Sequence, residues 1–343
     1  MKQSKKNILA GAGRYGEEAL RFFGADSVYC FADNYRQGQD YCEKKVISFD
    51  ELKRIHLDYQ IILSVGYPSL EELSNQLSEA GITFVSYWDV YETYCINSPD
   101  DVRIASYKNR HKGEKCFLVG NGSSLLPSDL DKIKKHNHVS IACNFIQRIF
   151  DRTDWRPEYY CCEELSVVLL NSDFIMNYPM KAKFIKKLLR EEDKKLFSNA
   201  PEDVHFYSGC VSKRDISSNV AKVIYNGFTV MFTMLQIAMY MGFSEIYLIG
   251  VDNTQPPGPH TKKFAELQSH FYTEDLDELK RRRELLPKFG FDDDWDKYNN
   301  LVNAHYMIAR DYAEEHCIKI FNATRGGHLE VFERIDIDEL IGD

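Results

Sequence analysis

The chain has 343 residues, with 44% hydrophobic residues, 28% charged residues and a formal net charge of −9. This length allows two domains that each bury a core of their own, and the composition is that of an ordinary globular protein. The acidic balance argues against a dedicated nucleic-acid binder, because such proteins are normally basic. It leaves nucleotide substrates open, since local loops rather than net charge bind phosphates.

Targeting signals and disulfides are not expected. The first residues, MKQSKKNILAGAG, are basic, but their apolar run is too short for a signal peptide and a glycine loop interrupts it. No apolar run reaches the length of a membrane-spanning helix. The nine cysteines form no C-x-x-C pair and lie mostly in strand-like segments. This pattern predicts reduced thiols, no metal site and a cytoplasmic location.

Residues 1–100 carry the pattern of a small Rossmann-like domain. A strand over 7–10 is followed by the spacing G-x-G-x-x-G at Gly11, Gly13 and Gly16, then by a helix to residue 23. A second strand over 28–32 ends at Asp33, about twenty residues after the glycines. This order predicts a βαβ unit that binds a nucleotide, with Asp33 on a ribose hydroxyl. The alternative is an accessory module that has kept the fold without a cofactor, and the sequence leaves both open.

Further elements complete this domain and lead into a larger one. Strands are expected over 61–65 and 82–85, with a helix over 69–80 between them. The polar, basic stretch 101–114 is interpreted as a linker. Beyond it, strands are predicted at 116–119, 138–143, 157–162, 204–207, 245–252 and 318–322, and helices at 174–190, 228–241 and 299–316. Alternating strands and helices predict an α/β fold with a mostly parallel, doubly wound sheet over 115–343.

A glycine loop (residues 120–124) opens this larger domain. Four apolar residues run into Gly120, Asn121, Gly122, Ser123 and Ser124, and a helix start follows. The glycines let the backbone approach a ligand, while the other residues supply polar side chains. Several predicted strands end in a polar residue, namely Asn121, Asn144, Glu163, Asp252 and Asn322. Because the carboxyl ends of parallel strands share one edge, these residues should line one crevice.

The segments around residues 120–125, 143–145, 241–252 and 318–327 resemble the MptE-like family over about 115–335. That family includes archaeal 6-hydroxymethylpterin diphosphokinases. Its members are similar to the bacterial lipo-oligosaccharide sialyltransferases of glycosyltransferase family 42 and to flagellin-glycosylating motility factors. The small first domain likewise resembles accessory domains of bacterial sugar-modifying enzymes. The resemblance therefore implies a sialyltransferase-like fold and a nucleotide or nucleotide-sugar substrate.

In the sialyltransferases a G-N-G-P-S loop and a C-N dipeptide bind the CMP of the donor. The resemblance assigns these roles to Gly120, Asn121, Gly122, Ser124 and Asn144, with Ser123 in place of proline. Thr229 loosely matches a T-S-G-like donor contact, and the G-I-D strand end corresponds to Gly250 and Asp252. The family's arginine near that contact has no counterpart. Its phosphate-binding tyrosines are also missing at 253 and 254, where Tyr272 or Tyr298 is the expected replacement.

The resemblance also implies a histidine base near the last long helix. His305 shares a helix face with apolar residues at three- and four-residue spacing, so it should point inward. His270 lies in the insert after Asp252. Either side chain suits a base near neutral pH, because histidine titrates there. A purely structural role for both is the remaining alternative.

Two reactions fit these patterns. Transfer of a sugar from a CMP-linked donor, with inversion, requires stabilisation of the leaving phosphate, which loop N–H groups and hydroxyls supply without metal. Diphosphoryl transfer from ATP instead requires Mg²⁺ on carboxylates, for which Asp252 and the acidic run 292–296 are candidates. The sequence favours the CMP-sugar glycosyltransferase, with a surface glycan, free or lipid-linked, as the acceptor. A nucleotide-binding scaffold without catalysis is a third interpretation.

Basic runs at 181–187 and 280–283 are two candidate contacts with the inner face of the plasma membrane. More often such runs are solvated helix faces. The acceptor, the linkage and the oligomeric state are beyond what the sequence determines.

Overall fold

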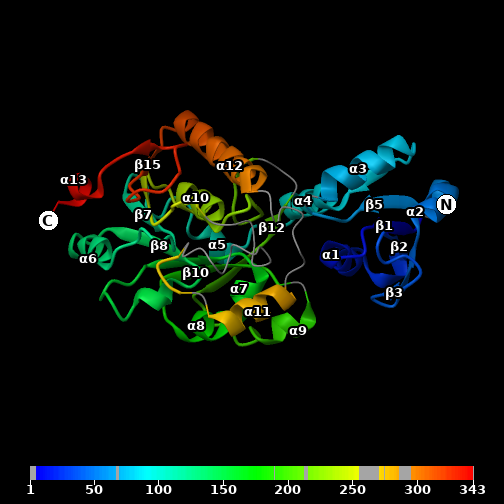
Figure 1. Ribbon diagram of the computed structural model, residues 1–343, viewed down its shortest axis with the longest axis horizontal. Helices are drawn as coiled ribbons and strands as arrows, with labels where there is room; N and C mark the ends of the chain where they lie inside the picture. The colour runs from blue at the N-terminus through cyan, green and yellow to red at the C-terminus, as the bar shows by residue number, and fades with distance from the viewer. Residues whose placement is uncertain are drawn as a thin grey trace. The chain divides into compact units, whose positions relative to one another are not determined.

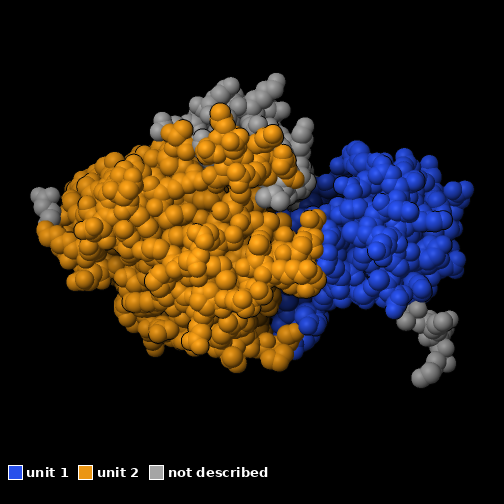
Figure 2. All heavy atoms as spheres, turned by 90° about the horizontal axis from the view of Figure 1, so that it is seen from below, with its two compact units in different colours: residues 1–97 blue, residues 98–343 orange. Residues whose placement is uncertain are grey.

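The computed structural model describes residues 5–66, 69–188, 190–211, 215–254, 270–273, 275–285 and 295–342. The chain divides into two compact units, residues 1–97 and 98–343, coloured separately in Figure 2. Each unit has its own sheet. In both units strands alternate with helices along the chain, which confirms the predicted α/β class.

Unit 1 (residues 1–97) holds a six-stranded sheet of order β3-β4-β2-β1-β5-β6, parallel except for the β3–β4 pair. Its strands are β1 (Asn7–Ala10), β2 (Val28–Ala32), β3 (Asp40–Tyr41), β4 (Lys44–Ile47), β5 (Gln60–Leu63) and β6 (Phe84–Ser86). Its helices are α1 (Arg14–Phe23), α2 (Phe49–Ile55), α3 (Ser69–Glu79) and α4 (Tyr87–Asn97).

Unit 2 (residues 98–343) is built on an eight-stranded sheet of order β11-β10-β9-β8-β7-β14-β15-β16, in which every pair is parallel. Its strands are β7 (Lys115–Val119), β8 (Val139–Cys143), β9 (Tyr159–Cys162), β10 (Ala182–Lys186), β11 (Val204–Tyr207), β14 (Glu245–Ile249), β15 (Lys319–Asn322) and β16 (Glu333–Arg334). A separate parallel pair consists of β12 (Gly209–Cys210) and β13 (Ile224–Tyr225).

Helices cover both faces of the large sheet (Figure 1). They are α5 (Val102–Ala105), α6 (Pro127–Lys135), α7 (Leu165–Leu170), α8 (Ser172–Asn177), α9 (Glu191–Lys195), α10 (Val230–Tyr240), α11 (Leu276–Leu285), α12 (Trp295–Glu315) and α13 (Ile337–Ile341). Helices α6, α7, α8 and α13 pack on one face through a single apolar cluster. Helix α10 packs against β7 and β9 and also against α12. Because α10 is apolar all round, with Met231 to Tyr240 buried, it forms the centre of its layer.

The order of the strands creates a switch point between β7 and β14. From β7 the chain adds β8 to β11 on one side, and it later returns to add β14 and β15 on the other. The loops that leave β7 and β14 therefore diverge to opposite faces. In open α/β sheets this divergence leaves a crevice at the carboxyl edge, where ligands bind.

Two sequence interpretations differ from the structure. The helix predicted over 174–190 is wrong, because α8 ends at Asn177 and Ala182–Lys186 forms strand β10, buried between β9 and β11. Pro179 explains the break, since proline cannot continue a helix. The stretch 101–114, interpreted as a linker, contains α5 and bonds to the end of α10, with Asn109 N donating to Tyr240 O and His111 N to Met241 O.

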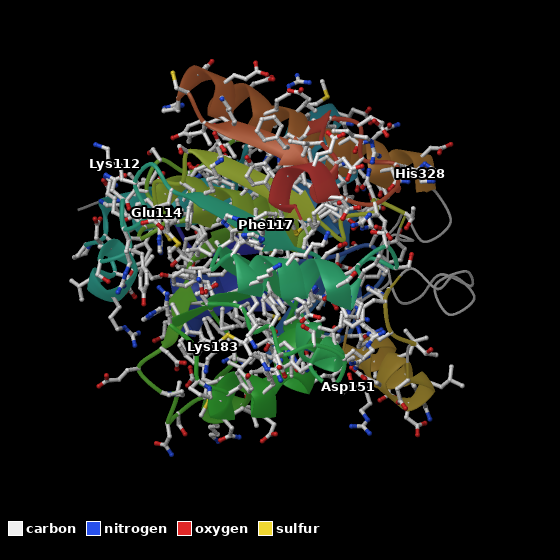
Figure 3. All side chains as sticks on the ribbon, turned by 90° about the vertical axis from the view of Figure 1, so that its left-hand side faces the viewer. Lys112, Glu114, Phe117, Asp151, Lys183 and His328 are labelled. Carbon is white, nitrogen blue, oxygen red and sulfur yellow. The ribbon has the colours of Figure 1, made fainter. Side chains whose placement is uncertain are left out.

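Neither basic run is simply a solvated face. Lys183 in β10 is fully buried; its Nζ donates to the Ile175 carbonyl at 2.7 Å and lies 3.0 Å from Asp203 (Figure 3). Arg282 in α11 is buried as well and pairs with Glu164 at 3.3 Å. Both cations therefore belong to the packed structure, and loss of the partner would leave either of them as an uncompensated buried charge.

Seven of the nine cysteines are buried. Burial raises the pKa of Cys30 and of Cys143 to about 12, so both stay protonated and unreactive at neutral pH. In the part of the chain that the structure describes, no helix has both the length and the apolar character needed to cross a bilayer.

A buried histidine makes the stability of unit 2 depend on pH. Burial lowers the pKa of His205, which packs on Tyr107 and faces the charges of Arg103, Asp101 and Asp203. In the unfolded chain a histidine takes up a proton near pH 6.5, whereas folded His205 resists it. The free energy of unfolding should therefore fall as the pH drops from 7.5 to 5.5. Urea unfolding of His205→Gln should show a smaller fall than the wild type; equal falls would contradict this account.

Candidate functional site

The glycine loop leaves β7 at the switch point and lies against the end of β14. Gly120 N donates to Ile249 O at 2.9 Å, and Gly122 N donates to Gly250 O at 2.8 Å. A Cβ on Gly120 would stand 2.4 Å from the Gly250 carbonyl oxygen, so only glycine permits this approach. Gly250 itself has φ of 62°, a conformation that favours glycine. The predicted loop and the predicted strand end are thus one assembly.

Asp252 fastens this loop. Its carboxylate accepts hydrogen bonds from Ser123 Oγ at 3.0 Å, from Ser124 N at 3.1 Å, and from Ser124 Oγ. A Cβ on Gly122 would lie 2.6–2.7 Å from the carboxylate atoms. Asp252 is 6% exposed. Its carboxylate contacts hold the loop in place, and both serine hydroxyls donate to it; its catalytic role stays a prediction.

The segment at residues 322–329 packs against the backbone of Asp252. His328 N donates to Asp252 O at 2.7 Å (Figure 3). Gly327, at φ of 73°, approaches so closely that a Cβ would stand 2.7 Å from Asp252 Cα. Asn322, the polar end of β15, is buried and donates to Leu329 O at 2.7 Å. Asn322 therefore shapes the turn that supports Asp252.

Asn121 connects the glycine loop to the end of β8. Its Nδ2 donates to the Cys143 carbonyl at 3.1 Å, while its Oδ1 is buried without a hydrogen-bond partner in the described part of the chain. Asn144 follows at φ of 50°, and its carbonyl accepts from Tyr160 Oη at 2.7 Å and Asn171 Nδ2 at 2.9 Å. The structure thus brings Asn121 and Asn144 to the same edge. A buried acceptor without a partner is typical of functional sites.

His270 lies directly on the glycine loop. It forms an antiparallel bridge with Gly122, and Phe271 N donates to Asn121 O at 3.1 Å. Its ring stacks on Tyr272 with centroids 4.8 Å apart, and the residue is 8% exposed. Of the two candidate histidines, this is the one that the described contacts place at the loop.

Arg148 anchors the segment that carries His270. Its guanidinium lies 4.2 Å from the ring centroid of Phe145 and 4.4 Å from that of Tyr272, and it pairs with Glu278 of α11. A cation between two aromatic faces gains from both quadrupoles. Tyr272 is therefore part of this stack, and its predicted role as a phosphate-binding tyrosine stays a prediction.

His305 packs between helices. It is 2% exposed, its ring meets Phe228 and Phe232 edge-on at 5.6 and 5.1 Å, and its Nδ1 lies 2.7 Å from Leu301 O. The side chain points inward, as its helical spacing predicts, and it faces α10. Its role as a base stays a prediction.

The N-terminus of α10 meets α12 at the same end of the sheet. Thr229 caps α10 and accepts from Met231 N, although no described contact tests its predicted donor role. Tyr298 Oη donates to Phe228 O at 2.8 Å. Asn253, next to Asp252, donates to Asn303 Oδ1 at 2.9 Å. Helix α12 is therefore hydrogen-bonded to the loop before α10 and to the loop after β14.

A polar cluster at the end of β9 was not assigned a role from the sequence. The Glu163 carboxylate accepts from Asn226 Nδ2 and, at 2.5 Å, from Thr233 Oγ1. The sequence identified Glu163 only as a polar strand end. Its partners lie 63 and 70 residues away, so no local pattern connects them.

The second glycine loop, in unit 1, is tied to Asp33. Ala12 N donates to Asp33 Oδ2 at 2.9 Å, and Tyr35 N and Arg36 N donate to Oδ1 at 2.8 and 3.0 Å. Gly11 and Gly16 pack tightly: a Cβ would stand 2.3 Å from Val65 and 2.1 Å from the Gly11 carbonyl oxygen, respectively. Gly13 has open space around it. Nucleotide binding in unit 1 stays a prediction.

Two further features lie apart from the crevice. An open depression of about 640 Å³ is lined by charged residues around Asp151 (Figure 3), where α6 ends and the chain turns toward the start of β9, at the amino edge of the sheet. In the described ranges, no three His, Cys, Asp or Glu side chains gather as they would around a metal ion. The acidic run at 292–294 lies outside those ranges, and Asp296 is exposed.

A known protein family matches the part of the chain that contains the switch point. Residues 93–256 match the MptE-like family. Its model is described as 6-hydroxymethylpterin diphosphokinase MptE-like, so the likeness is to a family named for an enzyme. The matched segment includes the glycine loop, Asn144, Glu163 and Asp252. This supports the MptE-like resemblance that the motifs indicated. A search of curated proteins gave no match.

The fastening of the loop can be tested by a double-mutant cycle. Gly122→Ala places a methyl group against the Asp252 carboxylate and should lower the free energy of unfolding by about 1–3 kcal/mol, as overpacking does. In an Asp252→Ala background the methyl group has room, so the cost should largely vanish. Urea unfolding of the four proteins measures the coupling. An equal cost in both backgrounds would show that the two residues do not contact.

Proposed function

We propose that unit 2 is a nucleotide-dependent transferase whose donor binds at the glycine loop. The donor is a CMP-activated sugar of the sialic acid or ulosonate type. The acceptor is a hydroxyl of a bacterial surface glycan, free or lipid-linked. The reaction inverts the anomeric carbon and needs no metal. The protein works in the cytoplasm, at or near the inner face of the plasma membrane.

The observation that carries this proposal is the position and build of the glycine loop. It lies at the switch point of an all-parallel sheet, where ligands bind in such folds. Its conformation is fixed in advance by Asp252 and by the end of β14. A loop held in this way keeps the donors that its internal contacts leave over in fixed positions, where they can stabilise developing charge without reorganising during the reaction. The leaving phosphate of a CMP-sugar is such a charge.

Asn121 supports a nucleotide in particular. Its buried Oδ1 has no partner among the described residues and accepts a hydrogen bond from an amino, imino or hydroxyl group of a ligand. Nucleobases and riboses offer these donors. The choice of CMP over other nucleotides rests on the resemblance of the loop and of Asn144 to the sialyltransferase pattern.

The family match favours a second candidate, diphosphoryl transfer from ATP to a hydroxymethylpterin. That reaction requires Mg²⁺ held by carboxylates. Asp252, the predicted ligand at the crevice, is buried and already accepts three hydrogen bonds from the loop. This arrangement favours the first candidate, although both use the same nucleotide seat.

Nucleotide binding and metal dependence separate the candidates. CMP at a hundred times its Kd should stabilise the protein by about 2.7 kcal/mol through mass action, measured as a thermal shift against UDP, NAD and ATP. CMP release from CMP-sialic acid, with a galactoside acceptor, should continue in excess EDTA. AMP formation from ATP and a hydroxymethylpterin, lost in EDTA, would establish the second candidate instead. Binding of neither CMP nor ATP would contradict both.

A further inference from the structure

The polar cluster at the end of β9 lies at the carboxyl edge of the sheet, the same edge at which the glycine loop leaves β7. Adjacent strands lie about 4.8 Å apart, and Glu163 follows β9, two strands from the glycine loop that follows β7. The carboxylate therefore lies roughly 10 Å along the sheet edge from the loop. A nucleotide phosphate at the loop leaves the space toward β9 for the molecule that receives the transferred group.

The Glu163 side chain is held rigidly and is only partly buried. Asn226 and Thr233, both buried at the N-terminal end of α10, each donate one hydrogen bond to it. Each carboxylate oxygen has a further lone pair that can accept a hydrogen bond or a proton. This combination of fixed direction and remaining capacity is what a general base requires.

Asn226 provides an independent sign of a ligand. It is 8% exposed, and its Oδ1 has no hydrogen-bond partner within the ranges described, while its Nδ2 is committed to Glu163. Gly209 makes room for it, because a Cβ there would stand 2.9 Å from Asn226 Oδ1 and 2.8 Å from Lys186 Cε. A buried acceptor left without a donor costs free energy unless a ligand supplies that donor.

The charge of Glu163 acts on two neighbouring tyrosines. Burial raises the pKa of Tyr207 and of Tyr298, and the negative charge of Glu163 contributes to both shifts. These two hydroxyls therefore remain protonated at neutral pH. The surroundings offer donors and acceptors suited to a hydroxyl-bearing co-substrate.

The two histidines are less suited to accept this proton. His305 is wedged between Phe228 and Phe232, and one ring nitrogen is engaged by its own helix. His270 is 8% exposed and stacks on Tyr272. Neither shares the partial exposure of Glu163 at the strand end.

We propose that Glu163 is the general base that takes the proton from the attacking hydroxyl, beside an acceptor seat completed by Asn226; this rests on the proposed function. The acceptor oxygen forms its bond to the anomeric carbon while the bond from that carbon to the phosphate oxygen breaks. CMP leaves with the electron pair, and the hydroxyl proton passes to Glu163. Water receives the proton after product release. In diphosphoryl transfer the hydroxyl oxygen forms its bond to the β-phosphorus of ATP while the bond from that phosphorus to the oxygen bridging to the α-phosphate breaks; AMP leaves with the electron pair, and the hydroxyl proton again passes to Glu163.

The test compares Glu163→Gln with Glu164→Gln in the full chain. Glu164 undergoes the same chemical change one residue further on, where it pairs with Arg282 and accepts from Ser166. CMP release from CMP-sialic acid is measured with a galactoside, and with water alone as acceptor; a parallel arm measures AMP release from ATP and a hydroxymethylpterin. Glu163→Gln should lower kcat by about 10²–10⁴ with the Kd for CMP within twofold, and Glu164→Gln should stay within threefold of wild type.

A second measurement separates a base from a structural residue. In the wild type, kcat/KM should fall on the acid side as the carboxylate is protonated, and this limb should disappear in Glu163→Gln. Sodium formate should raise the kcat of Glu163→Ala at least tenfold, because it supplies a carboxylate in place of the missing one. A residue with a purely structural role would not be rescued in this way.

The outcomes are distinguishable. Wild-type nucleotide binding and turnover together with near-normal rates in Glu163→Gln would overturn this inference alone, and a large loss in His270→Ala would then return the role to histidine. Nucleotide binding without turnover in either arm would also overturn it. Absence of nucleotide binding in the wild type would contradict the proposed function, and the inference with it.

Discussion

The hydrogen bonds between Asp252 and the serines of the glycine loop are the interaction on which the site depends. They join the ends of β7 and β14, the two strands at which the sheet changes direction. Without this carboxylate, the two serines would lose these hydrogen bonds, and the loop would be held by the contacts of Gly120 and Gly122 with β14, of Asn121 with β8 and of the His270 segment with Asn121 and Gly122. The close approach of Gly122 and Gly327 to Asp252 explains why glycine stands at both positions. The loop is therefore rigid before any ligand arrives.

This arrangement gives the two sides of the switch point different tasks. On the β14 side, the C-terminal segment and α12 hold Asp252 and Asn253. On the β8 and β9 side, Asn121 bonds to the end of β8, and Asn226 donates to Glu163 at the end of β9; the Oδ1 atoms of both asparagines are buried without partners among the described residues. The first side is complete in itself, whereas the second has acceptor capacity that a ligand would use. This asymmetry fits the proposed transferase, which has two substrates.

Much of the fold could be predicted from the sequence because its signals are local. The glycine loops, the apolar strands and the long helices α10 and α12 follow from composition and period. Strand β10 could not be predicted this way, since its lysines at 183 and 186 suggest a solvated helix, and the burial of Lys183 depends on Asp203 and Ile175. The polar strand ends could be identified from the sequence, and the crevice that they should line stays a prediction. The role of Asp252 and the partners of Glu163 could not, because contacts across more than sixty residues leave no periodic trace.

The segment that matches the MptE-like family includes the switch point, where the proposed nucleotide site lies. The most direct measurement is a crystal structure of the chain with CMP. The account predicts the phosphate within hydrogen-bond distance of the loop at residues 120–124, with the nucleoside against Asn121 and Asn144 and the space beside Glu163 open. A nucleotide bound only at the glycines of unit 1, or a crevice closed to it, would contradict the account.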